Sequence, residues 1–138
     1  MKKYHFDKLL REDGWKTNVE IICDSKGIIT AIEEDAKLSD AKRITGYAIP
    51  GFQNAHSHAF QYAMAGLAEL HMQSNQRDDF WSWREAMYNL ALSISPDQIE
   101  SIATMLYSEM VRQGYTNVAE FHYIHHDKNG KPYENLAE

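Results

Sequence analysis

The chain has 138 residues, of which 43% are hydrophobic and 25% are charged, a composition typical of a globular protein with one hydrophobic core. Its net charge of −6 argues against a nucleic-acid-binding surface. No apolar run approaches the roughly 20 residues that span a bilayer, and the N-terminus lacks the apolar segment of a secretory signal. The single cysteine, Cys23, is expected to be a buried thiol. Together these features lead us to expect a cytoplasmic protein with neither nucleic-acid nor membrane partners.

The first part of the chain, residues 1–48, is expected to form a β-rich segment. Two β-branched runs, 18–23 and 28–32, are separated by a short polar loop that ends in Gly27, a pattern typical of a hairpin. Gly27 can supply the positive φ angle that such loops often need. The charged stretch 33–42 is expected to be an exposed connection.

The rest of the chain predicts alternating strands and helices. The apolar run 49–58 predicts a short strand, in which Gly51 permits unusual backbone angles. This strand ends with His56 and His58. The segment 59–68 follows directly, is rich in small residues and predicts a helix.

The next helix is expected to begin at Asp78 and Asp79, which can cap its N-terminus. One face of this helix carries large apolar and aromatic side chains at helical spacing. We expect this face to be core rather than a cofactor site. Its members are Phe80, Trp83, Met87 and Leu90.

The third helix has the clearest boundaries. Ser95 fits an N-cap, Pro96 fits the first helical position, and Gln98 completes a capping box. Gly114 can end the helix, and residues 115–122 predict a second strand. The apolar stripe of the helix consists of Ile99, Ile102, Ala103, Leu106 and Met110.

Strand, helical crossover and strand form a βαβ unit, whose strands are expected to be parallel with a right-handed connection. In parallel α/β folds, active-site residues lie at the carboxyl ends of the strands. His56 and His58 lie at one such end, and His122 and Tyr123 lie at the next. A (β/α)₈ barrel takes about 250 residues, so residues 49–138 predict only its opening part.

The two histidines at the first strand end predict a metal site. Because side chains alternate along a strand, His56 and His58 project to the same side and can converge on one ion. Neutral imidazole suits zinc, and two such ligands leave coordination positions for other groups.

The run P-G-F-Q-N-A-H-S-H resembles the first barrel strand of the amidohydrolase superfamily, where a similar run supplies two metal ligands. Three motifs, in order, narrow this resemblance to the formimidoylglutamate deiminases of bacterial histidine degradation. They are H-S-H-A-F-Q-Y-A-M-A-G-L-A-E, D-D-F-W-S-W-R-E-A-M-Y and V-A-E-F-H-Y-I-H-H. The resemblance is close over residues 46–134. The fold that it implies is α/β, a metal-dependent (β/α)₈ barrel preceded by residues 1–48 as part of a composite β-sandwich.

The function that the resemblance implies is hydrolysis of the formimidoyl C–N bond of N-formimidoyl-L-glutamate to N-formyl-L-glutamate and ammonia. One zinc ion would bind to His56 and His58, with iron as an alternative metal, and it would supply the nucleophile by lowering the pKa of water to about 7. Matching positions imply that Gln61, Arg84 and Tyr123 bind substrate. An arginine fork suits a carboxylate because it binds both oxygens. The alternatives are a local helix amide for Gln61, a surface arginine for Arg84 and a packing tyrosine for Tyr123.

The remaining metal ligands and proton-transfer residues of this family are expected after residue 138, so the chain alone is expected to be incomplete and inactive. No catalytic residue is therefore assigned within it. Glu120 is a possible buried partner for a neighbour, with an open role. The other histidines are expected to be structural or incidental: His5, His71, His122, His125 and His126.

Two other functions stay open. The first is another deaminase of the superfamily that acts on a neutral base, which would not need the carboxylate clamp of Arg84 and Tyr123. The second is a non-catalytic, truncated fragment that binds metal or pairs with another protein through its sheet edges. The preferred partner is a small amino-acid substrate, and a homodimer is compatible with the sequence of the complete enzyme.

Overall fold

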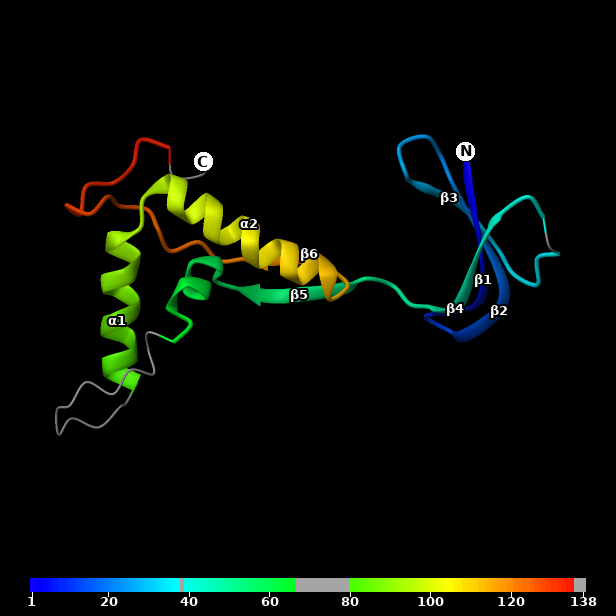
Figure 1. Cartoon of the computed structure of the whole chain (residues 1–138), viewed down its shortest axis with the longest axis horizontal. Coiled ribbons are helices and arrows are strands. Elements are labelled where there is room, and N and C mark those ends of the chain that lie inside the picture. Colours follow the sequence, from blue (N-terminus) through cyan, green and yellow to red (C-terminus); the bar gives the residue numbers. More distant parts are fainter. Residues whose placement is uncertain (38, 67–79, 136–138) are drawn as a thin grey trace. The chain divides into compact units, whose positions relative to one another are not determined.

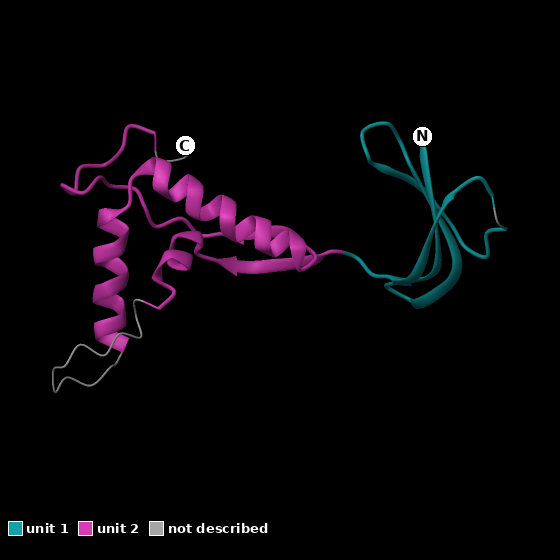
Figure 2. Cartoon of the chain, viewed as in Figure 1, with its two compact units in different colours: residues 1–50 teal, residues 51–138 magenta. Residues whose placement is uncertain are grey.

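The computed structural model describes residues 1–37, 39–66 and 80–135, which belong to two compact units, residues 1–50 and 51–138 (Figures 1 and 2). The first unit contains only strands and the second combines strands with helices, so the fold is α/β. No helix within the described parts is long and apolar enough to cross a membrane. The assignment of residues 1–48 to a sandwich and 49–138 to a barrel concerns a larger fold and stays a prediction.

The first unit is a four-stranded sheet with the strand order β3-β2-β1-β4. Strands β1 (Lys2–Arg11) and β2 (Gly14–Cys23) pair antiparallel along their full length. On one side β3 (Ile29–Glu33) pairs with β2 antiparallel, and on the other side β4 (Lys42–Ala48) pairs with β1 in parallel. The order therefore leaves β3 and β4 as the edge strands of this sheet.

The predicted hairpin of β2 and β3 is confirmed. In its loop the Asp24 carboxylate accepts hydrogen bonds from the backbone N–H groups of Lys26 (2.8 Å) and Ile28 (2.9 Å), and Gly27 has a φ angle of +88°. Cys23 is buried at the end of β2, as expected. Strand β4 is not among the predicted elements, because six of its seven residues are exposed and its sequence lacks an apolar alternation.

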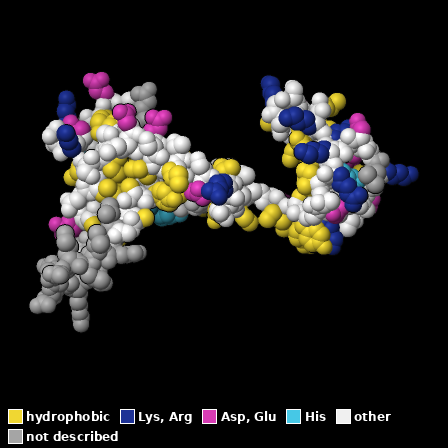
Figure 3. Space-filling model, viewed as in Figure 1, with side chains coloured by type: hydrophobic (Ala, Val, Ile, Leu, Met, Phe, Trp, Pro, Cys, Tyr) yellow, Lys and Arg dark blue, Asp and Glu magenta, His cyan; other side chains and the backbone are white. Residues whose placement is uncertain are grey.

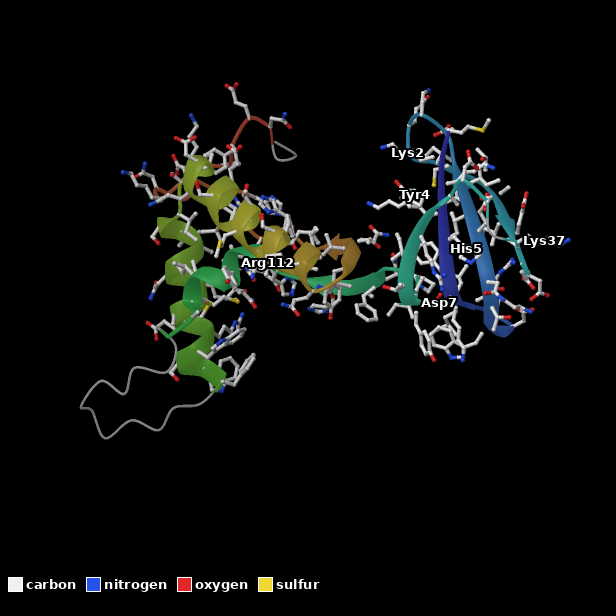
Figure 4. All side chains as sticks on the ribbon, turned by 45° about the vertical axis from the view of Figure 1, so that its right-hand side comes forward. Lys2, Tyr4, His5, Asp7, Lys37 and Arg112 are labelled. Carbon is white, nitrogen blue, oxygen red and sulfur yellow. The ribbon has the colours of Figure 1, made fainter. Side chains whose placement is uncertain are left out.

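Polar contacts fasten β4 to β1. The Asp7 carboxylate, labelled in Figure 4, accepts hydrogen bonds from the Gly46 N–H (2.9 Å) and the Arg43 guanidinium (3.0 Å). The Gly46 N–H and, next, the Arg43 side chain lower the pKa of Asp7. His5 lies on the same strand, is buried, and pairs in register with the buried Glu20 of β2, so it is part of the interior of this unit.

The second unit is built on a two-stranded parallel sheet of β5 (Phe52–Ser57) and β6 (Tyr115–Glu120). Between these strands come a 3₁₀ helix, η1 (Ala59–Met64), and the helices α1 (Phe80–Ser93) and α2 (Pro96–Arg112). Helix α2 contacts both η1 and β6 (Figure 1). The predicted strand–helix–strand order with parallel strands is confirmed.

The predicted ends of α2 are also confirmed. The Gln98 N–H donates to the Ser95 hydroxyl (3.3 Å), and the Ser95 N–H donates to the Gln98 side chain (2.9 Å), which completes a capping box. Gly114 follows the helix with a φ angle of +89°. Its carbonyl accepts a hydrogen bond from the Phe52 N–H (2.9 Å), so the turn after α2 is joined to the start of β5.

Gly51 has a different role from the expected one. It is not among the glycines with a positive φ angle, so its backbone is not what requires glycine. Instead, a Cβ atom at this position would collide with the side chain of Thr116 on β6. The close approach of the two backbones at the start of β5 therefore requires the absence of a side chain.

The core of the second unit lies where η1, α1 and the segment after β6 meet. Its buried members are Phe60, Met64, Met87, Ala91, Ile94 and Ile124. The apolar stripe of α2 is partly buried, and Ile99 and Ile102 pack against this core.

Two expectations about the middle of the chain need correction. The segment after His58 is a 3₁₀ helix over Ala59–Met64, not a longer helix within the described residues. On α1, Met87 is buried, but Phe80 and Trp83 are 62% and 38% exposed, because only the second half of α1 reaches the core. The predicted cap at Asp78 and Asp79, the end of the predicted helix at residues 67 and 68, and His71 lie outside the described residues.

Hydrophobic side chains also lie on the surface of both units (Figure 3). In the second unit several of them belong to the sheet or the segment directly after it. Phe52 is 49% exposed on β5, Tyr115 is 36% exposed on β6, and Phe121 is 62% exposed. The two-stranded sheet is therefore incompletely covered by the described helices.

Candidate functional site

The His56-Ser57-His58 segment lies at the carboxyl end of β5. His56 and Ser57 are the last two residues of the strand, and His58 is the N-cap of η1, one residue beyond the strand that was predicted to include it. The end of β6 runs alongside, because Ser57 pairs with Glu120 and its carbonyl accepts a hydrogen bond from the Phe121 N–H (2.9 Å). Two parallel strand ends therefore meet at the candidate site.

The imidazole rings of His56 and His58 converge. Their Nε2 atoms are 2.9 Å apart, and the ring planes meet edge to face at 80°. His56 is exposed and His58 is half-buried, so the pair is open on one side and supported on the other. This arrangement agrees with the prediction that both side chains project to one side of the chain.

A backbone carbonyl fixes the proton of His58. The His58 Nδ1 atom lies 3.0 Å from the Phe121 carbonyl oxygen. Because a carbonyl can only accept, Nδ1 carries the proton in the neutral ring, which leaves a lone pair on Nε2. A histidine that binds a metal through Nε2 typically donates its other N–H to a carbonyl or carboxylate in this way.

The histidine pair fits two positions of a zinc site. In a tetrahedral site with Zn–N distances of about 2.0–2.1 Å, two ligand nitrogens are about 3.3 Å apart. The observed 2.9 Å is close to that value, and small ring rotations can supply the difference. The described residues contain no group of three or more His, Cys, Asp or Glu side chains that could hold a metal, so within them His56 and His58 supply two ligands only. Their role as ligands stays a prediction.

Tyr123 lies next to the histidine pair. Its ring is 4.9 Å from that of His58 and 5.6 Å from that of Phe60, measured between centroids. The Phe121 ring, 5.8 Å from that of His58, completes an aromatic wall on this side. The structure therefore brings Tyr123 together with His58, although the two residues are far apart in sequence.

Gln61 and Arg84 point elsewhere. The Gln61 side-chain amide donates a hydrogen bond to the Met87 sulfur (3.3 Å), and the Gln61 backbone N–H donates to the His58 carbonyl (3.0 Å). The Arg84 guanidinium lies over the rings of Tyr88 (5.3 Å) and Trp81 (5.7 Å) on its own helix. Among the described residues, no hydrogen bond or ion pair joins Arg84 to the histidine pair. The substrate-binding roles of Gln61, Arg84 and Tyr123 stay predictions.

Glu120 is the residue of this region whose role the sequence left open. Its Oε1 atom accepts a hydrogen bond from the Ala59 N–H (2.6 Å), and its Oε2 atom is buried without a hydrogen-bond partner in the described parts. Its neighbour Tyr107 has a pKa raised to about 12, first by burial and then by the Glu120 carboxylate. Parallel pairing of the two strands could have indicated this contact, because it places the end of β6 beside residues 57–59.

The remaining histidines of the described residues belong to no group of three or more potential metal ligands. The rings of His122 and His125 meet edge to face at 5.3 Å. His126 belongs to a short bridge with Pro132. The structural or loop roles expected for these three residues stay predictions.

Comparisons with known proteins show which family this chain resembles. The sequence pattern of the amidohydrolase family matches residues 47–138. A formimidoylglutamate deiminase from Pseudomonas aeruginosa is 48% identical over 132 residues, an alignment that covers 96% of this chain and 29% of that relative. A crystal structure of an amidohydrolase from Brucella melitensis superposes with a TM-score of 0.86 at 46% identity, over 99% of this chain and 30% of that one. The chain thus spans less than a third of the length of these relatives.

Proposed function

Since this chain belongs to the amidohydrolase family, we propose that it supplies part of the active site of a metal-dependent hydrolase acting on the formimidoyl C–N bond of N-formimidoyl-L-glutamate. The products would be N-formyl-L-glutamate and ammonia: the oxygen of water bonds to the formimidoyl carbon, and the bond from that carbon to its terminal nitrogen breaks. The 48% identity to the Pseudomonas aeruginosa deiminase supports this choice of substrate.

The observation that carries the proposal is the convergence of His56 and His58. Their Nε2 atoms are 2.9 Å apart, and the His58 Nδ1 atom is held by the Phe121 carbonyl. These residues would hold one zinc ion, which supplies Lewis-acid activation of water when it is bound. The chain's own contribution is to bring two imidazole Nε2 atoms to one point, with the proton of His58 kept on the opposite side of its ring.

The substrate carries two carboxylates at one end and the reacting carbon at the other. The Tyr123 hydroxyl can donate a hydrogen bond to a substrate carboxylate next to the histidine pair, because the Tyr123 ring packs 4.9 Å from that of His58. Arg84 would bind a carboxylate with two parallel hydrogen bonds, and Gln61 would exchange its contact with Met87 for one to the substrate. The Arg84 side chain is exposed on α1, so it is accessible to a ligand.

The larger fold is part of the same proposal. Residues 51–138 would be the opening part of a (β/α)₈ barrel, and residues 1–50 would belong to a composite β-sandwich. The exposed Phe52, Tyr115 and Phe121 on and after the two-stranded sheet support the presence of further barrel elements against it. The proposed location is the cytoplasm.

The test is activity and metal content in the complete enzyme. We expect ammonia release from N-formimidoyl-L-glutamate, one zinc per site, and loss of both in His56→Ala and His58→Ala. A matched control is His126→Ala, which changes an exposed histidine outside the pair. Normal zinc content and turnover in both variants of the pair would refute the metal site. Activity on a neutral base with none on the proposed substrate would indicate the other class of deaminase.

A further inference from the structure

We infer that Glu120 is a positioning residue for the metal-binding face of His58. The end of β6 contacts three consecutive residues of β5 and η1, and the Glu120 carboxylate supplies the contact that fixes the turn after the histidine. This inference rests on the metal site proposed above, because it assigns a function to the orientation of one of its ligands.

The first step of the argument is the conformation of His58. It occupies the N-cap position of η1, where the side chain of a Ser, Thr, Asp or Asn usually accepts a hydrogen bond from the first helical N–H groups. The His58 side chain makes no such bond, because its Nδ1 faces the Phe121 carbonyl and its Nε2 faces His56. The turn therefore needs an acceptor from another part of the chain.

Glu120 supplies that acceptor. Its Oε1 atom lies 2.6 Å from the Ala59 N–H, and a carboxylate makes a shorter and stronger hydrogen bond to an N–H than a neutral acceptor does. Ala59 itself is 4% exposed, so water has little access to replace the carboxylate. The bond fixes the backbone immediately after His58 and leaves the imidazole free to face His56.

Two backbone contacts extend this support. The Phe121 N–H donates to the Ser57 carbonyl (2.9 Å), and the Phe121 carbonyl accepts from His58 Nδ1 (3.0 Å). Residues 57, 58 and 59 are thus each held by residue 120 or 121. A displacement of the Ala59 backbone would move the His58 ring away from the Phe121 carbonyl. That carbonyl selects the tautomer with the lone pair on Nε2.

Tyr107 supports the carboxylate from α2. The Tyr107 phenol stays protonated at neutral pH, since burial and the Glu120 carboxylate together raise its pKa to about 12. A protonated phenol remains a potential donor to this carboxylate, whereas an ionised one would repel it. Glu120 therefore has a neutral phenol as a neighbour on one side and a backbone N–H as a donor on the other.

The test compares two substitutions of Glu120 in the complete enzyme. Glu120→Gln keeps a side-chain oxygen that can accept from the Ala59 N–H, whereas Glu120→Met has a similar length and no such acceptor. The control, Glu100→Ala, removes an exposed carboxylate from α2. The probe is Co²⁺, titrated by its visible absorption, and the tautomer of His58 is read from ¹H–¹⁵N long-range spectra of the metal-free chain.

We expect Glu120→Met to weaken Co²⁺ binding by about 10- to 100-fold, the range typical for loss of a group that orients a metal ligand. Glu120→Gln should restore binding to within about 10-fold of the parent chain, and Glu100→Ala should leave it unchanged. The Nδ1–H tautomer of His58 should persist in the parent chain and in Glu120→Gln and should be lost in Glu120→Met.

The outcomes separate this inference from the proposed function. Unchanged affinity and tautomer in a folded Glu120→Met chain would overturn the inference while leaving the metal site intact. If Glu120→Met loses its helical circular dichroism, the Glu120→Gln variant provides the test. Co²⁺ binding by Glu120→Gln as weak as that of His58→Ala would contradict the positioning role, because an amide oxygen can also accept the hydrogen bond from the Ala59 N–H. Co²⁺ binding that survives His58→Ala would refute the metal site, and the tautomer measurements would then still test Glu120.

Discussion

Replacing Gly51 with alanine tests the close packing at the start of the metal-binding strand. A Cβ at position 51 would overlap Cγ2 and Oγ1 of Thr116 and would lie 2.8 Å from its Cβ, so both rotation and retreat of the threonine are required. Thr116 Oγ1 also accepts a long hydrogen bond from the Gln53 side chain (3.5 Å), which would be disturbed. Overpacking of this kind costs about 1–3 kcal/mol of unfolding free energy.

The assay is urea unfolding followed by circular dichroism, together with a thermal melt. For a unit of this size a loss of 1 kcal/mol corresponds to a fall in Tm of about 4–8 °C. Because the strain arises between β5 and β6, we also expect the Co²⁺ affinity of the histidine pair to fall. The affected contact lies at the opposite end of β5 from that pair, so this effect would pass through the pairing of the strands.

A second substitution distinguishes the clash from other causes. Thr116→Gly removes all three atoms that a new Cβ would meet, so the double variant Gly51→Ala/Thr116→Gly should be more stable than the sum of the single effects predicts. A coupling of about 0.5–3 kcal/mol is typical for residues in direct contact. Additive effects of the two changes, or a Gly51→Ala chain as stable as the parent, would refute the proposed reason for glycine at this position.

Four further substitutions test the substrate site and the folded units. Arg84→Met should lower kcat/KM for N-formimidoyl-L-glutamate in the complete enzyme by several hundred-fold and leave the zinc content unchanged, since a buried substrate carboxylate without its partner costs about 3–5 kcal/mol. Near-normal kcat/KM in this variant would mark Arg84 as a surface residue. Tyr123→Phe removes one hydrogen bond to a charged group and should cost about 1.5–3 kcal/mol of transition-state binding. The pKa of Asp7 is lowered in the folded state, so its hydrogen bonds to Gly46 and Arg43 stabilise the fold at pH values above the usual pKa of 3.8. This stabilisation is lost as the pH falls through the lower pKa of the folded state. The unfolding free energy of Asp7→Asn should therefore depend less on pH in that range. Ser95→Ala removes the cap of α2 and should lower the unfolding free energy by about 1 kcal/mol in urea, whereas an unchanged midpoint would show that the cap contributes nothing.

Local patterns predicted the elements whose cause is local. The capping box at Ser95 and the loop at Gly27 depend on residues within a few positions, and both are present as predicted. The parallel pairing of β5 with β6 was also predictable, because a helix of this length joins the two strands. The i, i+2 spacing likewise placed His56 and His58 on one side.

Other features depend on contacts between distant residues, which a single sequence does not display. The role of Gly51 comes from Thr116, and the burial of α1 depends on which half of the helix meets the core. Helical spacing placed Phe80 and Trp83 on the same face as Met87, but it could not show that the first turns of the helix extend beyond the buried cluster. The acceptor for the Ala59 N–H is likewise 61 residues away.

That separation has a consequence for the order of folding. The bond between His58 and the Phe121 carbonyl joins residues 63 positions apart, and closing a loop of this length costs about 3.7 kcal/mol of chain entropy from its length dependence alone. Helix α2, with its own cap, can form before that loop closes, whereas the histidine tautomer can be selected only afterwards. The chain therefore acquires its ligand geometry late, when β6 docks, and the first partial opening that separates the two strands would abolish it while leaving most of the helical structure in place.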